Sequence, residues 1–282
     1  MAWVILPVVI ADQSAPTLGA FWLPVTDKLL ITPGGLRGNS MAEEIYLVAS
    51  SEDFTRQAIG LLAVAGTAAV AARGRFTMVL TGGRTVQPLY QGLSVVPELQ
   101  KLLCERTEYF WGDERMVPAT HPDSNFGLAR RLFLDELRVP AAHQHPVATA
   151  PVEPGAACIY EKELRGFFAD DLSAEGLPIF DLVLLGLGPD GHVASLFPGS
   201  AALVEQQRWA VMVAQPGLAP MVPRVTLTLP VLNQARMILI LAAGAERIAL
   251  ARRISRKEAG TGSLPAARLC PAGRLVWLLM YG

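Results

Sequence analysis

The chain has 282 residues, of which 51% are hydrophobic, and 24 basic side chains against 25 acidic ones give a net charge of −1. This length is enough for one large α/β domain or two smaller ones. The balanced charge leaves no basic stripe for a nucleic-acid partner, and the lack of an uninterrupted apolar run of about 18 residues argues against a membrane span.

Residues 1–40 differ in character from the rest of the chain. The first ten residues are apolar but have no positively charged segment before them, which argues against a signal peptide. A glycine-containing, loop-like stretch then leads to Met41, where regular structure begins. We therefore expect residues 1–40 to be a poorly ordered extension and residues 41–282 to form a single domain.

From residue 45 onward, apolar segments typical of strands alternate with segments typical of helices. The expected strands span residues 45–49, 76–80, 107–111, 181–185, 209–214, 225–229, 237–242 and 275–280. The expected helices span residues 54–72, 86–93, 125–137, 156–169 and 246–255. This alternation predicts an α/β fold with a largely parallel sheet covered by helices on both faces. Because ligands of such sheets bind beyond the carboxyl ends of the strands, the loops after the strands are the place to search for a site.

The first such loop comes after the strand at 76–80 and reads Thr-Gly-Gly-Arg-Thr. Gly82 and Gly83 allow backbone N–H groups to turn inward, and Thr85 is placed to cap the following helix, whose N-terminus favours an anion. The loop is therefore either a phosphate cradle or an ordinary tight turn between a strand and a helix. It lacks the spacing of a Walker loop.

The second loop comes after the strand at 107–111 and contains an acidic pair. Asp113 and Glu114 are adjacent, so on an extended chain they point to opposite sides and cannot both face one ligand. The sequence indicates either one carboxylate in a cleft with Arg115 beside it or a surface loop with a local ion pair. Asp123 is also a candidate helix cap.

The third loop closes the segment FDLVLLGLGPDGHVASLFPG, which begins at residue 180. Its glycines fit the spacing G-x-G-x-x-G of a dinucleotide-binding turn, but Pro198 comes seven residues after Gly191 and permits barely two helical turns. Asp190 stands where a pyrophosphate approaches in that fold, and Glu205, the next acid, comes too early to bind the ribose. We therefore disfavour a nicotinamide cofactor.

His192 is the most informative residue of this third loop. It is one of four histidines in the chain and comes directly after a buried strand and a glycine-rich turn. Imidazole is suited to moving a proton near neutral pH, and Asp190 is close enough along the chain to orient it. The alternative is a purely structural histidine. No H-x-x-x-H or H-E-x-x-H pattern accompanies it, so we expect no metal.

Two arginines complete the set of candidates. Arg224 begins the strand RVTLTL, and Arg247 lies at the start of a helix after a strand. Guanidinium binds phosphate through two hydrogen bonds, whereas a single arginine is more often a solvated surface residue. A cleft that combined both arginines with the loop at 81–85 would favour a phosphorylated ligand.

Taken together, five segments resemble the 6-phosphogluconolactonase family from about Met41 to the C-terminus. They are LTGGRTVQPLY, EYFWGDERMVPATHPDSNFGLARRLF, FDLVLLGLGPDGHVASLFPG, RVTLTLPVLNQARMILILAAGAER and LPAARL. The resemblance implies the Rossmann-like fold of glucosamine-6-phosphate deaminase. It also implies hydrolysis of 6-phospho-D-glucono-1,5-lactone to 6-phospho-D-gluconate in the oxidative pentose phosphate pathway, with no metal or cofactor.

The resemblance also implies roles for particular residues. His192 is expected to be the general base that deprotonates the attacking water, with Asp190 supporting its turn. The groups expected at the phosphate are Gly82, Gly83, Thr85, Arg224 and Arg247, those expected on the sugar side are Asp113 and Asn125, and Arg84 and Arg115 adjoin them. The family usually has Ser or Thr in place of Arg84 and Lys in place of Arg247, so this chain departs from the family at two of its expected phosphate contacts.

Three other functions compete with lactone hydrolysis. Deaminases of this fold place a glutamate five residues after the histidine, where this chain has Phe197. A serine esterase requires a G-x-S-x-G elbow, which does not occur in the sequence. A non-catalytic sugar-phosphate sensor normally carries a DNA-binding module, for which residues 1–40 are too short and too weakly charged.

The partners and the location can be inferred by the same reasoning. We expect a sugar-phosphate lactone as the ligand, no nucleic acid or membrane partner, and a monomer or small homo-oligomer. Three widely spaced cysteines fit neither a disulfide framework nor a metal site, so we expect a reducing compartment, the cytoplasm.

Overall fold

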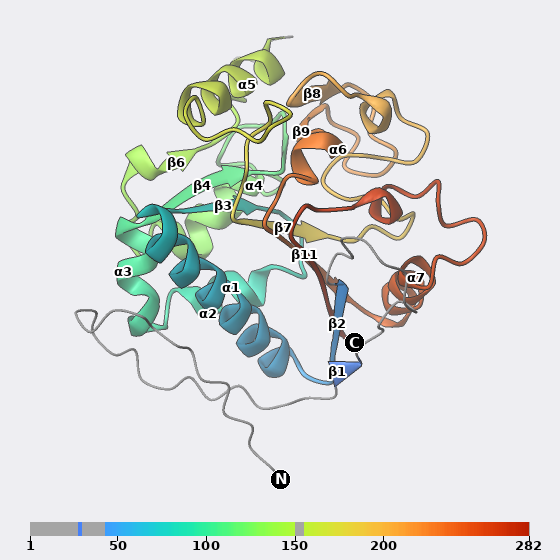
Figure 1. Cartoon of the computed structure of the whole chain (residues 1–282), viewed down its shortest axis with the longest axis horizontal. Helices are drawn as coiled ribbons and strands as arrows, with labels where there is room; N and C mark the ends of the chain where they lie inside the picture. The colour runs from blue at the N-terminus through green and yellow to red at the C-terminus, as the bar shows by residue number, and fades with distance from the viewer. Residues whose placement is uncertain (1–27, 30–42, 150–154, 282) are drawn as a thin grey trace.

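A largely parallel eight-stranded sheet forms the centre of the molecule in a computed structural model that describes residues 28–29, 43–149 and 155–281 (Figure 1). The strand order is β1-β2-β11-β10-β7-β3-β4-β6. The strands are β1 (Lys28–Leu29), β2 (Glu43–Val48), β3 (Phe76–Leu80), β4 (Thr107–Trp111), β6 (Gln144–His145), β7 (Leu182–Gly186), β10 (Met237–Ala243) and β11 (Arg274–Met280). All neighbours are parallel except β1 and β2.

The central strands are buried on both faces, which explains their continuous apolar sequences. All five residues of β3 are buried, as are the first four of β7 and the first six of β10. Such burial requires helices on both faces, and it confirms the α/β class predicted from the alternation of elements.

Seven α-helices surround this sheet in the described part of the chain. They are α1 (Ser51–Arg73), α2 (Gln87–Leu93), α3 (Pro97–Glu105), α4 (Asn125–Ala129), α5 (Ala156–Phe167), α6 (Leu229–Leu232) and α7 (Ala245–Ser255). Helix α1 packs across β3, β7 and β11, whereas α7 packs on β10 and β11. From β2 through α1 to β3 the chain moves along the sheet in one direction, and from β10 through α7 to β11 it moves in the other. The rule of right-handed crossovers therefore places α1 and α7 on opposite faces of the sheet.

Helix α1 has clear start and stop signals. The Ser50 hydroxyl accepts a hydrogen bond from the backbone N–H of Asp53 at 3.0 Å, and Gly74 ends the helix in a left-handed conformation with φ of 75°. The helix is long and apolar enough to cross a membrane by composition. Its packing on the central sheet accounts for that composition, because a core helix satisfies the same criterion.

A second, three-stranded sheet lies beside the first, with α5 packed against it (Figure 1). Its order is β5 (Asp113–Arg115), β9 (Arg224–Leu227) and β8 (Ala210–Val213), and all pairs are antiparallel. The sequence predicts β8 and β9 as strands but does not separate them from the parallel sheet. The loop between them is too short for a parallel crossover helix, so they pair with each other antiparallel.

Several predicted elements differ from the structure. The helix expected over 125–137 is α4 followed by a π-helical stretch, Arg130–Leu134, where the N–H of Asp135 donates to the carbonyl of Arg130 at 3.1 Å. Helix α3 and strand β6 were not predicted. Pro97 followed by Glu98 is a helix start signal that could have indicated α3. Strand β6 has two residues, too few for a periodic pattern.

The expected N-terminal extension lies mostly outside the described residues. Within residues 1–40 the structure describes Lys28–Leu29, which pair with Tyr46 and Ile45 of β2. The prediction of a single domain over residues 41–282 stays a prediction.

Candidate active site

Most predicted site residues follow the carboxyl ends of four neighbouring strands, β10, β7, β3 and β4, whereas Arg224 begins β9 of the small sheet. The chain runs outward in one direction from β3 through β4 to β6, and in the other from β7 through β10 to β11. The strand order therefore reverses between β3 and β7. In open α/β sheets this reversal creates the crevice in which ligands bind.

His192 and Asp190 form a close pair after β7. The His192 Nδ1 atom lies 2.6 Å from Oδ1 of Asp190, and the same oxygen accepts the backbone N–H of His192 at 3.2 Å. A carboxylate only accepts hydrogen bonds, so Nδ1 carries the proton and Nε2 of the neutral ring has a free lone pair. The histidine side chain is 19% exposed, which leaves it partly open to solvent. The pair can therefore accept a proton at Nε2.

The glycines of this turn make room for the histidine. A Cβ atom on Gly188 would lie 2.0 Å from Nδ1 of His192, which is impossible without moving the ring. Gly191 has a φ of 81°, a conformation that favours glycine. No α-helix comes directly after this turn in the described residues, since the next element is the 3-10 helix Ala201–Val204. The G-x-G-x-x-G spacing therefore builds the histidine turn, and no α-helix begins at this turn, unlike in a dinucleotide-binding fold.

Gly82, Asn125 and Asp113 form a second contact set between the loops after β3 and β4. The Asn125 side-chain amide donates to the carbonyl of Asp113 at 2.8 Å and to its Oδ1 at 3.2 Å. A Cβ atom on Gly82 would lie 1.8 Å from Oδ1 of Asn125. Gly82 is therefore required for the close approach of Asn125. This set brings the predicted sugar-side residues against the predicted phosphate loop.

The Glu114 side chain points away from that contact set, as expected for the neighbour of Asp113 on an extended chain. It is linked to the set through the backbone N–H of Asn125. Its buried carboxylate accepts the backbone N–H groups of Asn125 at 2.8 Å and Phe126 at 2.7 Å, at the start of α4. Burial raises the pKa of Glu114 above its usual value, although these N–H bonds oppose that shift. The N-cap of α4 is Ser124, so the alternative that Asp123 caps this helix is wrong.

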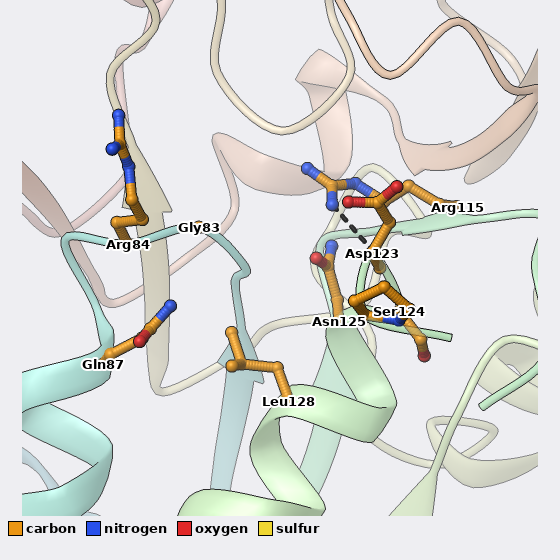
Figure 2. A pocket seen from close by; sticks show the side chains of 9 residues that line it. Gly83, Arg84, Gln87, Arg115, Asp123, Ser124, Asn125 and Leu128 are labelled. Atoms are coloured by element: carbon orange, nitrogen blue, oxygen red, sulfur yellow. Dashed lines mark hydrogen bonds between the residues drawn. The ribbon is translucent and has the colours of Figure 1, made fainter. Parts of the chain in front are cut away.

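A pocket opens between the loop after β3 and the segment before α4 (Figure 2). Arg84 and Gln87 stand on one side of it, Arg115 and Asn125 on the other, and Leu128 lies between them. Gly83 and Arg84 are exposed, and no side-chain hydrogen bond occupies Arg84 within the described residues. The pocket therefore has a cationic wall that is open to a ligand.

Arg115 is the arginine of this pocket that the fold holds in place. Its guanidinium donates to the carbonyl of Asp123 at 2.8 Å, drawn as a dashed line in Figure 2, and its Nε lies 4.0 Å from Oδ2 of Asp113. The backbone carbonyl and the carboxylate fix its direction. The pairing of Arg115 with one carboxylate, which the sequence offered as an alternative to a solvated loop, is present in this structure.

Arg224 lies outside the lining of this pocket. Its guanidinium donates to the carbonyls of Leu218 and Pro220 at 2.9 and 3.0 Å and stacks over the Phe197 ring at 5.4 Å. Burial lowers the pKa of Arg224, the charge of Asp113 opposes the shift, and the charge of a neighbouring arginine adds to it. The buried Nε of Arg224 has no hydrogen-bond partner within the described residues.

Arg247 also lies outside the pocket lining, beside the histidine turn. Its Nε donates to the carbonyl of Leu187 at 2.9 Å, which leaves the other guanidinium nitrogens for a ligand. Thr85, by contrast, does not cap the helix after β3, although the sequence predicted that it would. The N-cap position of α2 is Val86, which offers no side-chain acceptor. That part of the phosphate-cradle prediction is wrong, because the helix begins one residue later than the capping geometry needs.

Sequence reasoning missed Ser195 and the ring contact that Phe197 makes. Ser195 lies three residues after His192 and donates its hydroxyl to Oδ2 of Asp113 at 2.6 Å. Phe197 packs its ring 4.7 Å from the His192 ring, whereas the sequence indicated only that a glutamate is absent from this position. No periodic signal marks either residue, since both lie in an irregular turn. Among the described residues, no group of three His, Cys, Asp or Glu side chains is placed to hold a metal.

The fold and the site together define an α/β protein with a histidine–aspartate pair at the topological switch point and an arginine-lined pocket at the same edge of the sheet, whose lining does not include the pair. Residues 49–277 match the family model of glucosamine-6-phosphate isomerases/6-phosphogluconolactonase, and the chain belongs to this family.

Known relatives agree with this assignment. The chain is 40% identical over 240 residues to the 6-phosphogluconolactonase of Synechocystis sp., a match that covers 85% of this chain and 96% of that protein. It is 35% identical to a chloroplastic 6-phosphogluconolactonase of Arabidopsis thaliana, covering 73% and 64% of the two chains. The solved 6-phosphogluconolactonase of Trypanosoma brucei superposes with a TM-score of 0.72 at 30% identity, covering 86% and 97%. The predicted family and fold are confirmed.

Proposed function

We propose that this chain hydrolyses 6-phospho-D-glucono-1,5-lactone to 6-phospho-D-gluconate, as a 6-phosphogluconolactonase of the oxidative pentose phosphate pathway. The observation that carries the proposal is the His192–Asp190 pair, whose 2.6 Å contact leaves Nε2 free to take a proton. The names of its relatives support the same reaction, because two of them match more than four-fifths of this chain at 30–40% identity.

In the proposed mechanism His192 acts first as a base and then as an acid. Nε2 takes a proton from water while the water oxygen bonds to the lactone carbonyl carbon. Asp190 holds the ring and stabilises the imidazolium that forms. The bond between this carbon and the ring oxygen then breaks, and the ring oxygen receives the proton from Nε2. The new carboxylic acid ionises as it leaves. A lactone is already an activated ester, so an oriented water and one base suffice.

The binding part of the proposal assigns the phosphate to the open pocket. Arg84 and Arg115 supply charge there, and the backbone at Gly82 and Gly83 supplies N–H donors, with Thr85 beside them. Arg247 of α7 borders the histidine turn through its bond to the Leu187 carbonyl, and Arg224 contributes positive charge from its buried position. Asp113 and Asn125 face the sugar hydroxyls from the contact set at Gly82.

Phe197 separates this function from the deaminase alternative. Its apolar ring packs at a tilt against the His192 ring, with 4.7 Å between the ring centroids, in the position where deaminases of this fold have a glutamate. A benzene ring cannot take or give a proton, so ring-opening chemistry lacks its second acid–base group. A non-catalytic sensor is the alternative from another class, and it predicts binding without turnover.

The other expectations also belong to the proposal. We propose that residues 41–282 form one domain, that the protein is a monomer or a small homo-oligomer, and that it works in the cytoplasm. Widely spaced, unpaired cysteines support a reducing compartment. The plant relative named as chloroplastic makes an organelle the competing location. Fractionation of source cells with an antibody against the chain distinguishes the two.

The test is hydrolysis of freshly prepared lactone by the purified full chain. We expect the wild type to accelerate hydrolysis and His192→Ala to lower kcat roughly 10²- to 10⁴-fold, the range for loss of a general base. Binding of 6-phosphogluconate should persist in the variant, which shows that it is folded. An inactive wild type that binds the product would favour the sensor. An active His192→Ala enzyme would refute the base assignment.

A further inference from the structure

Ser195 connects the histidine turn to the small antiparallel sheet. Its hydroxyl donates to Oδ2 of Asp113 at 2.6 Å, and its backbone N–H donates to the Thr226 hydroxyl at 3.2 Å. Asp113 and Thr226 are directly opposite each other in the β5–β9 pair. Both hydrogen-bond donors of Ser195 therefore bond to one cross-strand pair.

The hydrogen bond to Asp113 has the character of a strong one. Its length falls within the range of charge-assisted bonds between a hydroxyl and a carboxylate. Ser195 is fully buried and Asp113 is 4% exposed, so water does not compete for this bond. A buried carboxylate that lost such a donor would have to move or find another one.

The backbone around Ser195 is held in an uncommon conformation. Ala194 has a φ of 49°, in the left-handed region that non-glycine residues seldom adopt. The N–H of Leu196 donates to the carbonyl of Val193 at 3.0 Å, which closes a tight turn around it. Strain of this kind persists where the surroundings impose it. Here it turns Ser195 back toward β5 and β9 within a few residues of His192.

Asp113 is the point at which three loops meet. Ser195 holds its Oδ2 from the turn after β7, and Asn125 donates to its Oδ1 at 3.2 Å. Asn125 in turn packs against Gly82 of the loop after β3. The Asp113 carboxylate is therefore hydrogen-bonded by one hydroxyl from the histidine turn and one amide from the pocket wall, with Arg115 Nε more distant at 4.0 Å from Oδ2.

We propose that Ser195 is a positioning residue that fixes the Asp113 carboxylate for substrate binding. The proposal rests on the function proposed above, in which Asp113 faces a sugar hydroxyl. Ser195 touches no reacting atom. Replacing it by alanine removes the hydroxyl but keeps the backbone N–H bond to Thr226, so the histidine turn keeps its anchor. The loss therefore falls on binding and spares the proton transfer.

The test compares Ser195→Ala with a matched removal of another buried hydroxyl. Thr228 is also fully buried and donates its hydroxyl to the Arg208 carbonyl at 2.7 Å, away from Asp113. We expect Ser195→Ala to raise KM and the Kd for 6-phosphogluconate about tenfold, the effect of one lost bond to a charged group, and to change kcat less than about threefold. Thr228→Val should lower thermal stability about as much as Ser195→Ala does, but it should leave KM and Kd within about twofold of the wild-type values.

A double-mutant cycle shows whether Ser195 acts through Asp113. In an Asp113→Ala background, Ser195→Ala should change KM and Kd less than about twofold further, because the carboxylate that it positions is already absent. Additive tenfold losses in the double variant would overturn the proposal, as would an unchanged KM in Ser195→Ala or an equal rise in KM in Thr228→Val. If the wild type neither hydrolyses the lactone nor binds 6-phosphogluconate, the proposed function fails first. If the wild type is active and Ser195→Ala has the same KM and Kd, the positioning role of Ser195 is wrong but the proposed function stands.

Discussion

The loop after β3 and the turn after β7 both carry closely spaced glycines at the ends of neighbouring parallel strands, yet they are held very differently. In the β3 loop Gly82 packs against Asn125, but beyond it nothing lies within 4 Å of a Cβ atom on Gly83, and Arg84 is exposed. In the β7 turn, Gly188 packs against the His192 ring and Gly191 packs against Leu264.

Anchors from other elements account for the difference. The Ala266 N–H donates to the carbonyl of Gly191 at 3.0 Å, and Arg247 donates to the carbonyl of Leu187 at 2.9 Å. Ser195 adds the bond from its hydroxyl to the sheet. Proton transfer needs a fixed donor–acceptor geometry, whereas a charged ligand is attracted over a longer range. Similar glycine patterns thus build a rigid turn at the proposed general base and an open loop at the proposed phosphate site.

The largest expected difference is in kcat, between alanine substitutions at one glycine of the β7 turn and one glycine of the β3 loop. Gly188→Ala places a carbon 2.0 Å from Nδ1 of His192, so the ring must leave Asp190. We expect kcat to fall about 100-fold, as for a catalytic group displaced by about 1 Å. Gly83→Ala meets open space and costs only the strain of its φ of 93°. It should lose about 1 kcal/mol of stability and keep kcat within about threefold.

Steady-state kinetics and thermal unfolding of both variants provide the measurement. An equal loss of kcat in the two variants would break the distinction between a rigid turn and an open loop. Retention of full activity by Gly188→Ala would show that the His192–Asp190 contact is dispensable.

An intermediate effect is expected from two arginines that border the site. Arg247→Ala removes both the proposed phosphate contact and the bond to the Leu187 carbonyl, so KM should rise about tenfold and the melting temperature should fall by a few degrees. Arg84→Ala should raise KM several-fold with no change in melting temperature, because its side chain makes no hydrogen bond in the described structure. A rise in KM confined to Arg84→Ala would assign the phosphate to the open loop alone.

The smallest effect concerns a histidine outside both loops. His145 lies between Glu163 at 2.8 Å and Glu108 at 3.1 Å and stacks on Phe110. Burial lowers its pKa, but the hydrogen bonds and charges of the two glutamates outweigh burial and raise it above 6.5. A raised pKa stabilises the fold fully below the unfolded value near 6.5, and this contribution is lost as pH rises through the folded pKa.

Thermal unfolding of His145→Gln across pH 5.5–8.5, a range of about 3 units around the histidine value, measures this contribution. At the acidic end we expect the free energy of unfolding of the wild type to exceed that of the variant by about 0.5 kcal/mol, a small value because Glu163 is half exposed. At the basic end this difference should vanish. The pH dependence of kcat should be the same in both proteins. A kcat profile that moves with His145 would contradict the assignment of the activity to His192.

Much of the fold could be predicted because its signals are local. The strands at 76–80 and 107–111 have the predicted boundaries, since each is a short, mostly buried segment with several large apolar or aromatic side chains between turn residues. The helix over 125–137 was predicted as uniform, but its change to π-helical hydrogen bonding leaves no mark in the apolar pattern. Strands β8 and β9 belong to a second, antiparallel sheet. The short loop between them is the one sequence feature that indicates antiparallel pairing.

The candidate site divides in the same way. The sequence predicted His192 and Asp190 as a pair because they are two residues apart on one turn, where contact is a local matter. It assigned Arg224 to the phosphate from its charge, whereas the structure bonds its guanidinium to two backbone carbonyls in the loop between β8 and β9. It could not find the contact of Ser195 with Asp113, because 82 residues separate them along the chain.

The sequence by itself determined the α/β class, the family and the identity of the histidine turn, since each depends on residue types at short spacing. The tertiary structure alone decided which loops meet. Parallel strands bring the ends of distant segments to one edge of the sheet, and the order β10-β7-β3-β4 selects the four that become neighbours. A hydrogen bond such as that from Ser195 to Asp113 depends on distances of a few tenths of an ångström, which packing of the whole core fixes and no local pattern encodes.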